Sequence, residues 1–290
     1  MELQWPLILF TTFIAWSCGL FAVQGIYAVR GEGAKAQLPS LICSLVLMVI
    51  GGIAVFTHLK HWERIFNGFG HITSGITQEL IAIVIVGIVM VAYFVMLRRS
   101  EDGNVPQWLG IVAIIVAVIL VVVMGHSYMM AARPTWNSLI QVFSLIGAAF
   151  ALGAGTFAAI NAATAEEPSE LNGAICLVGN VVNVLAVVAF LAYMVSSAGS
   201  LIGAEWYIDM TDPTAAKVTA AQFSPFTSDN MPMSIVALVA SVAGFAFAYL
   251  GKVKGNWKVW GATAAICAAV SAVALRMVFY AAGGTAYMIF

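Results

Sequence analysis

Eight long apolar segments constrain the fold more than any other feature of this sequence. A helix of about 20 apolar residues crosses about 30 Å of hydrocarbon, and only helices or closed barrels satisfy their backbone groups there. The segments are continuously apolar instead of alternating, which favours helices. The expected spans are residues 6–29, 38–59, 79–97, 108–130, 139–163, 172–197, 233–250 and 259–280. The sequence therefore predicts an all-α membrane protein, an eight-transmembrane-helix bundle forming a single domain over residues 1–290.

Composition excludes several classes of protein. Hydrophobic residues make up 62% of the chain and charged residues 9%, against about 25% charged residues in soluble domains. The mean hydropathy is +0.99. This high hydrophobicity leads us to expect that membrane lipid surrounds the chain. The net charge of −1 gives no sign of a polyanion-binding surface, so we expect no nucleic-acid partner. Small residues at four-residue spacing predict close helix packing; these are Gly147, Ala151 and Gly155, and Ala264, Ala268 and Ala272.

Lysine and arginine predict the orientation, because cytoplasmic loops are enriched in both. Seven lie in loops after odd-numbered spans: Arg30, Lys35, Arg98, Arg99, Lys252, Lys254 and Lys258. Four lie in loops after even-numbered spans: Lys60, Arg64, Arg133 and Lys217. We therefore expect both termini on the outer (periplasmic) side of the cytoplasmic membrane. The first span lacks the basic leader and cleavage site of a signal peptide, so we expect it to be retained.

Cysteine and histidine limit the redox cofactors that the chain can hold. The four cysteines are isolated and form no CxxC motif, so we expect no iron–sulfur cluster and no metal in this chain. A transmembrane haem pair needs matched histidines at two depths. All four histidines lie on the expected outer side, at His58, His61, His71 and His126. The sequence therefore predicts no haem.

The densest polar set joins the second span to the third. It comprises His58, Lys60, His61, Glu63, Arg64, His71 and Glu79. An apolar stripe in the same loop predicts a short interfacial helix, with Trp62, Ile65, Phe66 and Phe69 on one face. Ionisable groups in a membrane are costly and mark functional sites, although most charges here could simply reach the headgroups. His58 and Glu79 end apolar runs, so we interpret them as an inward-facing, proton-accepting pair.

A second polar set follows the fourth span on the same expected side. It comprises His126, Tyr128, Arg133, Thr135 and Trp136. Arg276 lies inside the eighth span, where it needs an acid such as Glu79, a cluster of carbonyls or a bound ligand. We include His126 and Arg276 among the candidate ligand-binding residues.

A series of short motifs resembles the membrane anchor subunit of dimethyl sulfoxide reductase, the DmsC family, over nearly the whole chain. The motifs are Trp5-Pro6-Leu7, Phe10-Thr11, His58-Leu59, Arg64, Phe66-Asn67, Ser74, Glu79, Pro134-Thr135-Trp136, Arg276 and Val278-Phe279-Tyr280. The resemblance implies an eight-helix protein with outer termini. It also implies two partners, an iron–sulfur electron-transfer subunit with 4Fe–4S clusters and a molybdopterin catalytic subunit. Menaquinol would be the bound substrate, oxidised without haem.

In the resembling family, the residues at the positions of His58 and Glu79 are tied to quinol binding. Arg64 and Arg276 match other recurrent positions, and we count Arg64 among the candidate quinol-binding residues. We therefore expect a respiratory subunit that carries the quinol-oxidising half-reaction and passes electrons to a partner on the outer face. Two alternatives remain: a secondary transporter, although no internal repeat supports it, and a passive anchor without a quinol site. The compound reduced by the partner stays open.

Overall fold

The computed structural model describes residues 3–58, 61, 67, 69–165, 169–201, 205–207 and 217–284. Eight long helices occur there, and each is long and apolar enough to cross a membrane. They are α1 (Trp5–Arg30), α2 (Ala34–Phe56), α3 (Gly75–Arg99), α4 (Gln107–Ser127), α5 (Leu139–Thr164), α6 (Leu171–Gly199), α7 (Met231–Lys254) and α8 (Trp257–Ala281). The chain is therefore a multi-pass helical membrane protein.

The expected spans agree with these helices to within about one helical turn at each end. The connection between α6 and α7 departs from an all-α fold. It contains strands β1 (Glu205–Tyr207) and β2 (Lys217–Thr219), which pair antiparallel, and the 3₁₀ turn η2 (Ala220–Phe223). Three-residue strands carry too short a pattern to be read from sequence.

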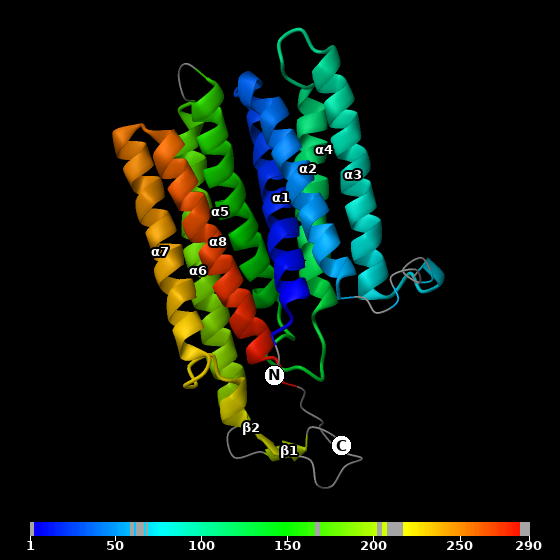
Figure 1. Cartoon of the computed structure of the whole chain (residues 1–290), viewed down its shortest axis with the longest axis vertical. Coiled ribbons are helices and arrows are strands. Elements are labelled where there is room, and N and C mark those ends of the chain that lie inside the picture. Colours follow the sequence, from blue (N-terminus) through cyan, green and yellow to red (C-terminus); the bar gives the residue numbers. More distant parts are fainter. Residues whose placement is uncertain are drawn as a thin grey trace.

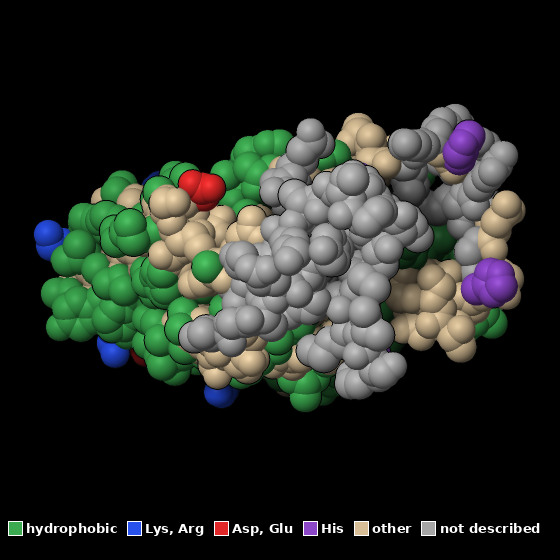
Figure 2. All heavy atoms as spheres, turned by 90° about the horizontal axis from the view of Figure 1, so that it is seen from below, with side chains coloured by type: hydrophobic (Ala, Val, Ile, Leu, Met, Phe, Trp, Pro, Cys, Tyr) green, Lys and Arg blue, Asp and Glu red, His purple; other side chains and the backbone are tan. Residues whose placement is uncertain are grey.

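The helices run alternately up and down, and α1 lies inside the bundle against α2, α4 and α5 (Figure 1). Helix α5 also packs against α6 and α8, and α7 packs against α8. One end of the bundle, which we call the terminal face, carries the starts of α1, α3, α5 and α7 and the ends of the other four helices. Figure 2 views this end, and histidine side chains are visible near one edge.

Glycine residues allow α1 to pack closely against both α5 and α4. A Cβ atom built on Gly153 of α5 would lie 2.2 Å from the carbonyl carbon of Gly19 on α1. On the other side of α1, a Cβ on Gly25 would lie 2.6 Å from the carbonyl oxygen of Gly110 on α4. In lipid, helices associate through such close packing because no hydrophobic effect drives them together. Helix α1 is thus fixed between α4 and α5 by glycine contacts.

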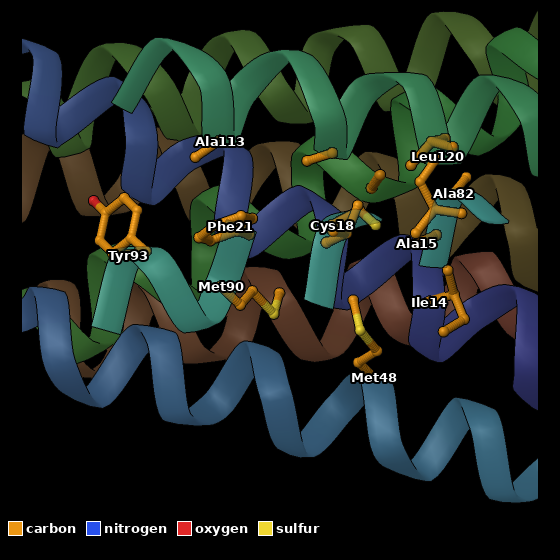
Figure 3. Close-up of a cluster of buried hydrophobic side chains, with 14 of the residues drawn as sticks. Ile14, Ala15, Cys18, Phe21, Met48, Ala82, Met90, Tyr93, Ala113 and Leu120 are labelled. Atoms are coloured by element: carbon orange, nitrogen blue, oxygen red, sulfur yellow. The ribbon is translucent and has the colours of Figure 1, made fainter. Parts of the chain in front are cut away.

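A cluster of buried apolar side chains fills the half of the bundle formed by α1 to α4 (Figure 3). Phe21 of α1 meets the ring of Tyr93 of α3 edge-on, with centroids 5.4 Å apart. The Tyr93 hydroxyl donates to Gln37 Oε1 at 2.8 Å, and Gln24 Nε2 donates to the Gln37 carbonyl at 2.8 Å. These buried hydrogen bonds tie α1, α2 and α3 together.

Candidate functional site

His58 and Glu79 line one cavity at the terminal face. Its volume is about 220 Å³, and the ends of α1, α2, α3 and α4 surround it. Most of the wall is apolar and includes Phe10 of α1, Val55 near the end of α2, and Ile83 of α3. His58, Glu79, Ser127 and Tyr128 supply its polar side chains. An apolar pocket with a few convergent polar groups is the usual form of a small-molecule site.

Glu79 is the buried acid of this cavity. Helix α3 begins at Gly75, so Glu79 lies one turn inside the helix, and only 8% of its surface is exposed. The Ser127 hydroxyl, from the last residue of α4, donates a hydrogen bond to Glu79 Oε1. The two helices approach closely here, because a Cβ on Gly75 would lie 2.8 Å from the Ser127 Cβ. Local packing therefore presents the carboxyl group to the cavity with one hydroxyl partner.

His58 reaches the cavity from the end of α2. Helix α2 ends at Phe56, and the His58 backbone N–H donates to the Val55 carbonyl at 3.0 Å, which continues the turn. Its side chain is exposed and lines the cavity. The arrangement places an imidazole at the mouth and a carboxyl group farther inside.

Tyr128 separates the cavity from α8. Its ring lies edge-on to those of Trp136 and Phe279, with centroids 6.0 and 5.8 Å away. Burial raises the pKa of Tyr128 well above its ordinary value. Tyr128 therefore stays a neutral phenol at physiological pH.

Arg276 lies apart from this cavity. It is 3% exposed, and Nη2 donates to Ser144 Oγ at 3.3 Å. Its guanidinium carbon lies 4.8 Å from the centre of the Phe279 ring. A separate space of about 10 Å³, bounded in part by Thr12 and Ser144, adjoins it. Within the part of the chain that the structure describes, Arg276 forms no ion pair with Glu79.

The other candidates do not gather around Glu79. The exposed His126 is absent from the cavity wall. His71 is exposed in the connection before α3. Arg64 and the centre of the expected interfacial helix, residues 62–66, lie outside the described residues.

Ser127 is the cavity residue that sequence reasoning missed. Met124, Ser127 and Tyr128 share one face of α4, because residues three and four apart lie above one another on a helix. His126 is rotated about 100° from Ser127, which turns it away from Glu79. The periodicity of α4, continued through its last turn, was the signal that could have selected Ser127 instead of His126.

The second polar set closes the end of α8. Arg133 Nη1 donates to the Gly283 carbonyl at 2.9 Å. Thr135 Oγ1 donates to the Ala282 carbonyl at 3.0 Å, and Trp136 Nε1 donates to the Phe279 carbonyl at 2.8 Å. The last carbonyls of a helix have no partner within that helix. These three donors supply partners at the end of α8, which accounts for the Pro134-Thr135-Trp136 motif in structural terms.

Replacing Thr135 by valine is expected to lower the free energy of unfolding by about 1 kcal/mol, because the buried Ala282 carbonyl loses its donor. Thermal unfolding in detergent measures the loss. The matched control is Thr263→Val, since the Thr263 hydroxyl donates only to the Val259 carbonyl of its own helix. If Thr135→Val and Thr263→Val unfold at the same temperature, the hydrogen bond from Thr135 to the Ala282 carbonyl does not stabilise the end of α8.

The chain is similar in sequence and in fold to known proteins. Residues 1–283 match the family model "DMSO reductase anchor subunit (DmsC)". The C subunit of the anaerobic dimethyl sulfoxide reductase of Escherichia coli (strain K12) is 32% identical over 146 residues. That alignment covers 47% of this chain and 50% of the relative, so the chain spans about half the length of the curated relative it matches.

The fold is similar to that of a bd oxidase from Geobacillus thermodenitrificans. The TM-score is 0.61, with 12% identity, over 96% of this chain and 85% of the oxidase chain. At this identity the likeness concerns the fold alone. The family match over nearly the whole chain is the stronger finding: the chain belongs to the DMSO reductase anchor subunit (DmsC) family.

Proposed function

We propose that this chain is the quinol-oxidising membrane subunit of a DMSO-reductase-type respiratory complex. Menaquinol binds in the cavity lined by His58 and Glu79. The electrons pass to an iron–sulfur partner on the terminal face, and a molybdopterin subunit uses them to reduce the terminal acceptor. The cavity that joins a buried carboxyl group to an imidazole within apolar walls is the observation that carries this proposal.

Quinol oxidation requires protein groups that accept the two hydroxyl protons of the quinol. Oxidation of one quinol to quinone releases two protons and two electrons. The Glu79 carboxylate accepts one hydroxyl proton and the His58 imidazole accepts the other, while both electrons go to the iron–sulfur partner. Because His58 is exposed, it can return its proton to water at the terminal face. The neutral Tyr128 phenol can donate a hydrogen bond to a ring oxygen.

The shape of the site supports entry from the membrane. A space of about 220 Å³ suits a quinol ring, and a long isoprenoid tail must remain outside it. Val55 of α2 and Ile76 of α3 flank the cavity, and these two helices pack only loosely against each other. Ile76 is 67% exposed, as expected for a side chain in contact with hydrocarbon. We therefore propose that the tail leaves between α2 and α3.

The distribution of lysine and arginine supports placing the terminal face on the outer (periplasmic) side of the cytoplasmic membrane. Both quinol protons are then released outside. If the partner consumes protons on the same side, turnover moves no net charge across the membrane.

Purification of the tagged chain in mild detergent from its native membrane tests the proposal. We expect a molybdopterin subunit and a cysteine-rich iron–sulfur subunit to co-elute, identified by mass. We also expect menaquinol to reduce the iron–sulfur clusters of the purified complex. A chain that elutes alone and takes up a solute would favour a transporter. A complex whose clusters menaquinol cannot reduce would favour a passive anchor.

A further inference from the structure

The Ser127 hydroxyl lies between two acceptors at the end of α4. It contacts Glu79 Oε1 on one side and the Met124 carbonyl, at 2.9 Å, on the other. A serine hydroxyl has one hydrogen to donate and two lone pairs that accept. It therefore cannot donate to both acceptors at once. Which one receives the hydrogen depends on whether Glu79 carries a proton.

Two arrangements satisfy this geometry. When Glu79 is a carboxylate, Ser127 donates to it and forms a charge-assisted hydrogen bond. When Glu79 is protonated, its own O–H donates to the Ser127 oxygen, and Ser127 turns its hydrogen to the Met124 carbonyl. Met124 is one of the last four residues of α4, whose carbonyls have no partner within an ideal helix. When Glu79 gains or loses its proton, rotation about the Cβ–Oγ bond of Ser127 converts one arrangement into the other.

The surroundings hold Ser127 in place for both arrangements. Met124 is fully buried, so its carbonyl is fixed to the bundle. Gly75 leaves no side chain between α3 and the Ser127 Cβ. Among the described residues, Glu79 has no lysine or arginine in contact with it, so Ser127 is the partner that the structure gives its carboxyl group.

We propose that Ser127 is a positioning residue whose hydroxyl changes hydrogen-bond direction as Glu79 accepts and releases the quinol proton. This inference rests on the proposed function. Ser127 itself neither takes the quinol proton nor carries electrons: the proton moves from the quinol hydroxyl to the Glu79 carboxylate. The serine keeps that carboxyl group in one orientation in both protonation states, so the group is ready for the next quinol.

The test compares Ser127→Ala with Ser127→Thr in the whole complex. Alanine is expected to lower kcat for menaquinol oxidation about tenfold, because a hydrogen bond to a charged group is lost. KM and the Kd of a quinol analogue are expected to change little, because the cavity keeps its shape. Threonine keeps the hydroxyl and is expected to restore kcat. The control is Ser200→Ala, since the Ser200 hydroxyl donates to the Ser197 carbonyl at 2.7 Å near the end of α6 in the same way.

Infrared difference spectra of the complex, recorded with and without menaquinol, provide a direct signature. The carboxyl C=O band that disappears in Glu79→Gln is expected to shift in Ser127→Ala and to stay in place in Ser127→Thr. Unchanged kcat and an unshifted band in Ser127→Ala would overturn the role of Ser127, even if Glu79→Gln is inactive. An active Glu79→Gln variant would instead overturn the proposed function.

Discussion

Replacing Glu79 by glutamine is expected to lower menaquinol-dependent turnover of the complex by about 100-fold, since a positioned proton acceptor contributes about 10²–10⁴-fold. Glutamine has nearly the same shape and can still accept a hydrogen bond from Ser127. It cannot take up a proton. The loss is therefore expected in kcat, with the cavity walls and the assembly of the complex unchanged.

The matched control for this variant is Glu32→Gln. Glu32 also accepts a hydrogen bond from a serine hydroxyl, that of Ser169, but it lies between α1 and α2 at the opposite end of the bundle. Its replacement is expected to leave turnover unchanged. Equal turnover of Glu79→Gln and the wild type, measured with saturating menaquinol, would contradict proton transfer at Glu79.

Replacing Gly153 by leucine is expected to lower the free energy of unfolding by about 3 kcal/mol, at the upper end of ordinary overpacking. A side chain at this position would run into the backbone of Gly19, 2.2 Å from the new Cβ. Backbone atoms cannot move aside as a flexible side chain can, so α1 and α5 must separate. Thermal unfolding in detergent and the amount of chain in the membrane measure the effect.

Gly87→Leu controls for the insertion of a leucine into a membrane helix. Gly87 lies in the middle of α3, and a Cβ there would meet nothing within 4 Å. We expect its stability to be close to that of the wild type. If Gly87→Leu and Gly153→Leu unfold at the same temperature, the contact between α1 and α5 does not hold the halves of the bundle together.

Hydrophobicity alone predicts the eight spans, because a membrane requires long apolar helices whatever their neighbours are. Helix ends differ from the expected positions by up to a turn, since polar residues can continue a helix beyond the hydrocarbon. Thus α3 begins at Gly75, whereas the apolar run suggested a start at Glu79. The order in which helices pack depends on contacts such as Gly19 with Gly153, which no single segment specifies.

The candidate site is predicted in part. His58 and Glu79 stand near the facing ends of two consecutive spans, so both lie at the same end of the bundle, where they line one cavity. Arg276 was expected as a possible partner of Glu79, but the helices place it in the separate environment of Ser144 and Phe279. Distances between helices that are remote in sequence follow from packing and cannot be obtained from spacing along the chain.

In the second polar set, residue type alone did not distinguish residues that bind a ligand from residues that stabilise the fold. Thr135 and Trp136 looked like functional polar residues beside a membrane. Their donors instead satisfy one carbonyl in the last turn of α8 and one directly after it, more than 140 residues away in sequence. Only the fold reveals that backbone carbonyls at the end of a distant helix accept hydrogen bonds from these two side chains.

Titration of the whole complex with a fluorescent quinol analogue tests the central claim most directly. We expect one saturable site from which menaquinol displaces the analogue. Ile83→Trp, which fills the cavity, is expected to abolish this binding. Ile85→Trp, on the lipid-facing side of the same helix, is expected to bind like the wild type, since Ile85 is 46% exposed. Saturable binding that persists in Ile83→Trp, or its absence from the wild type, would contradict a quinol site between His58 and Glu79.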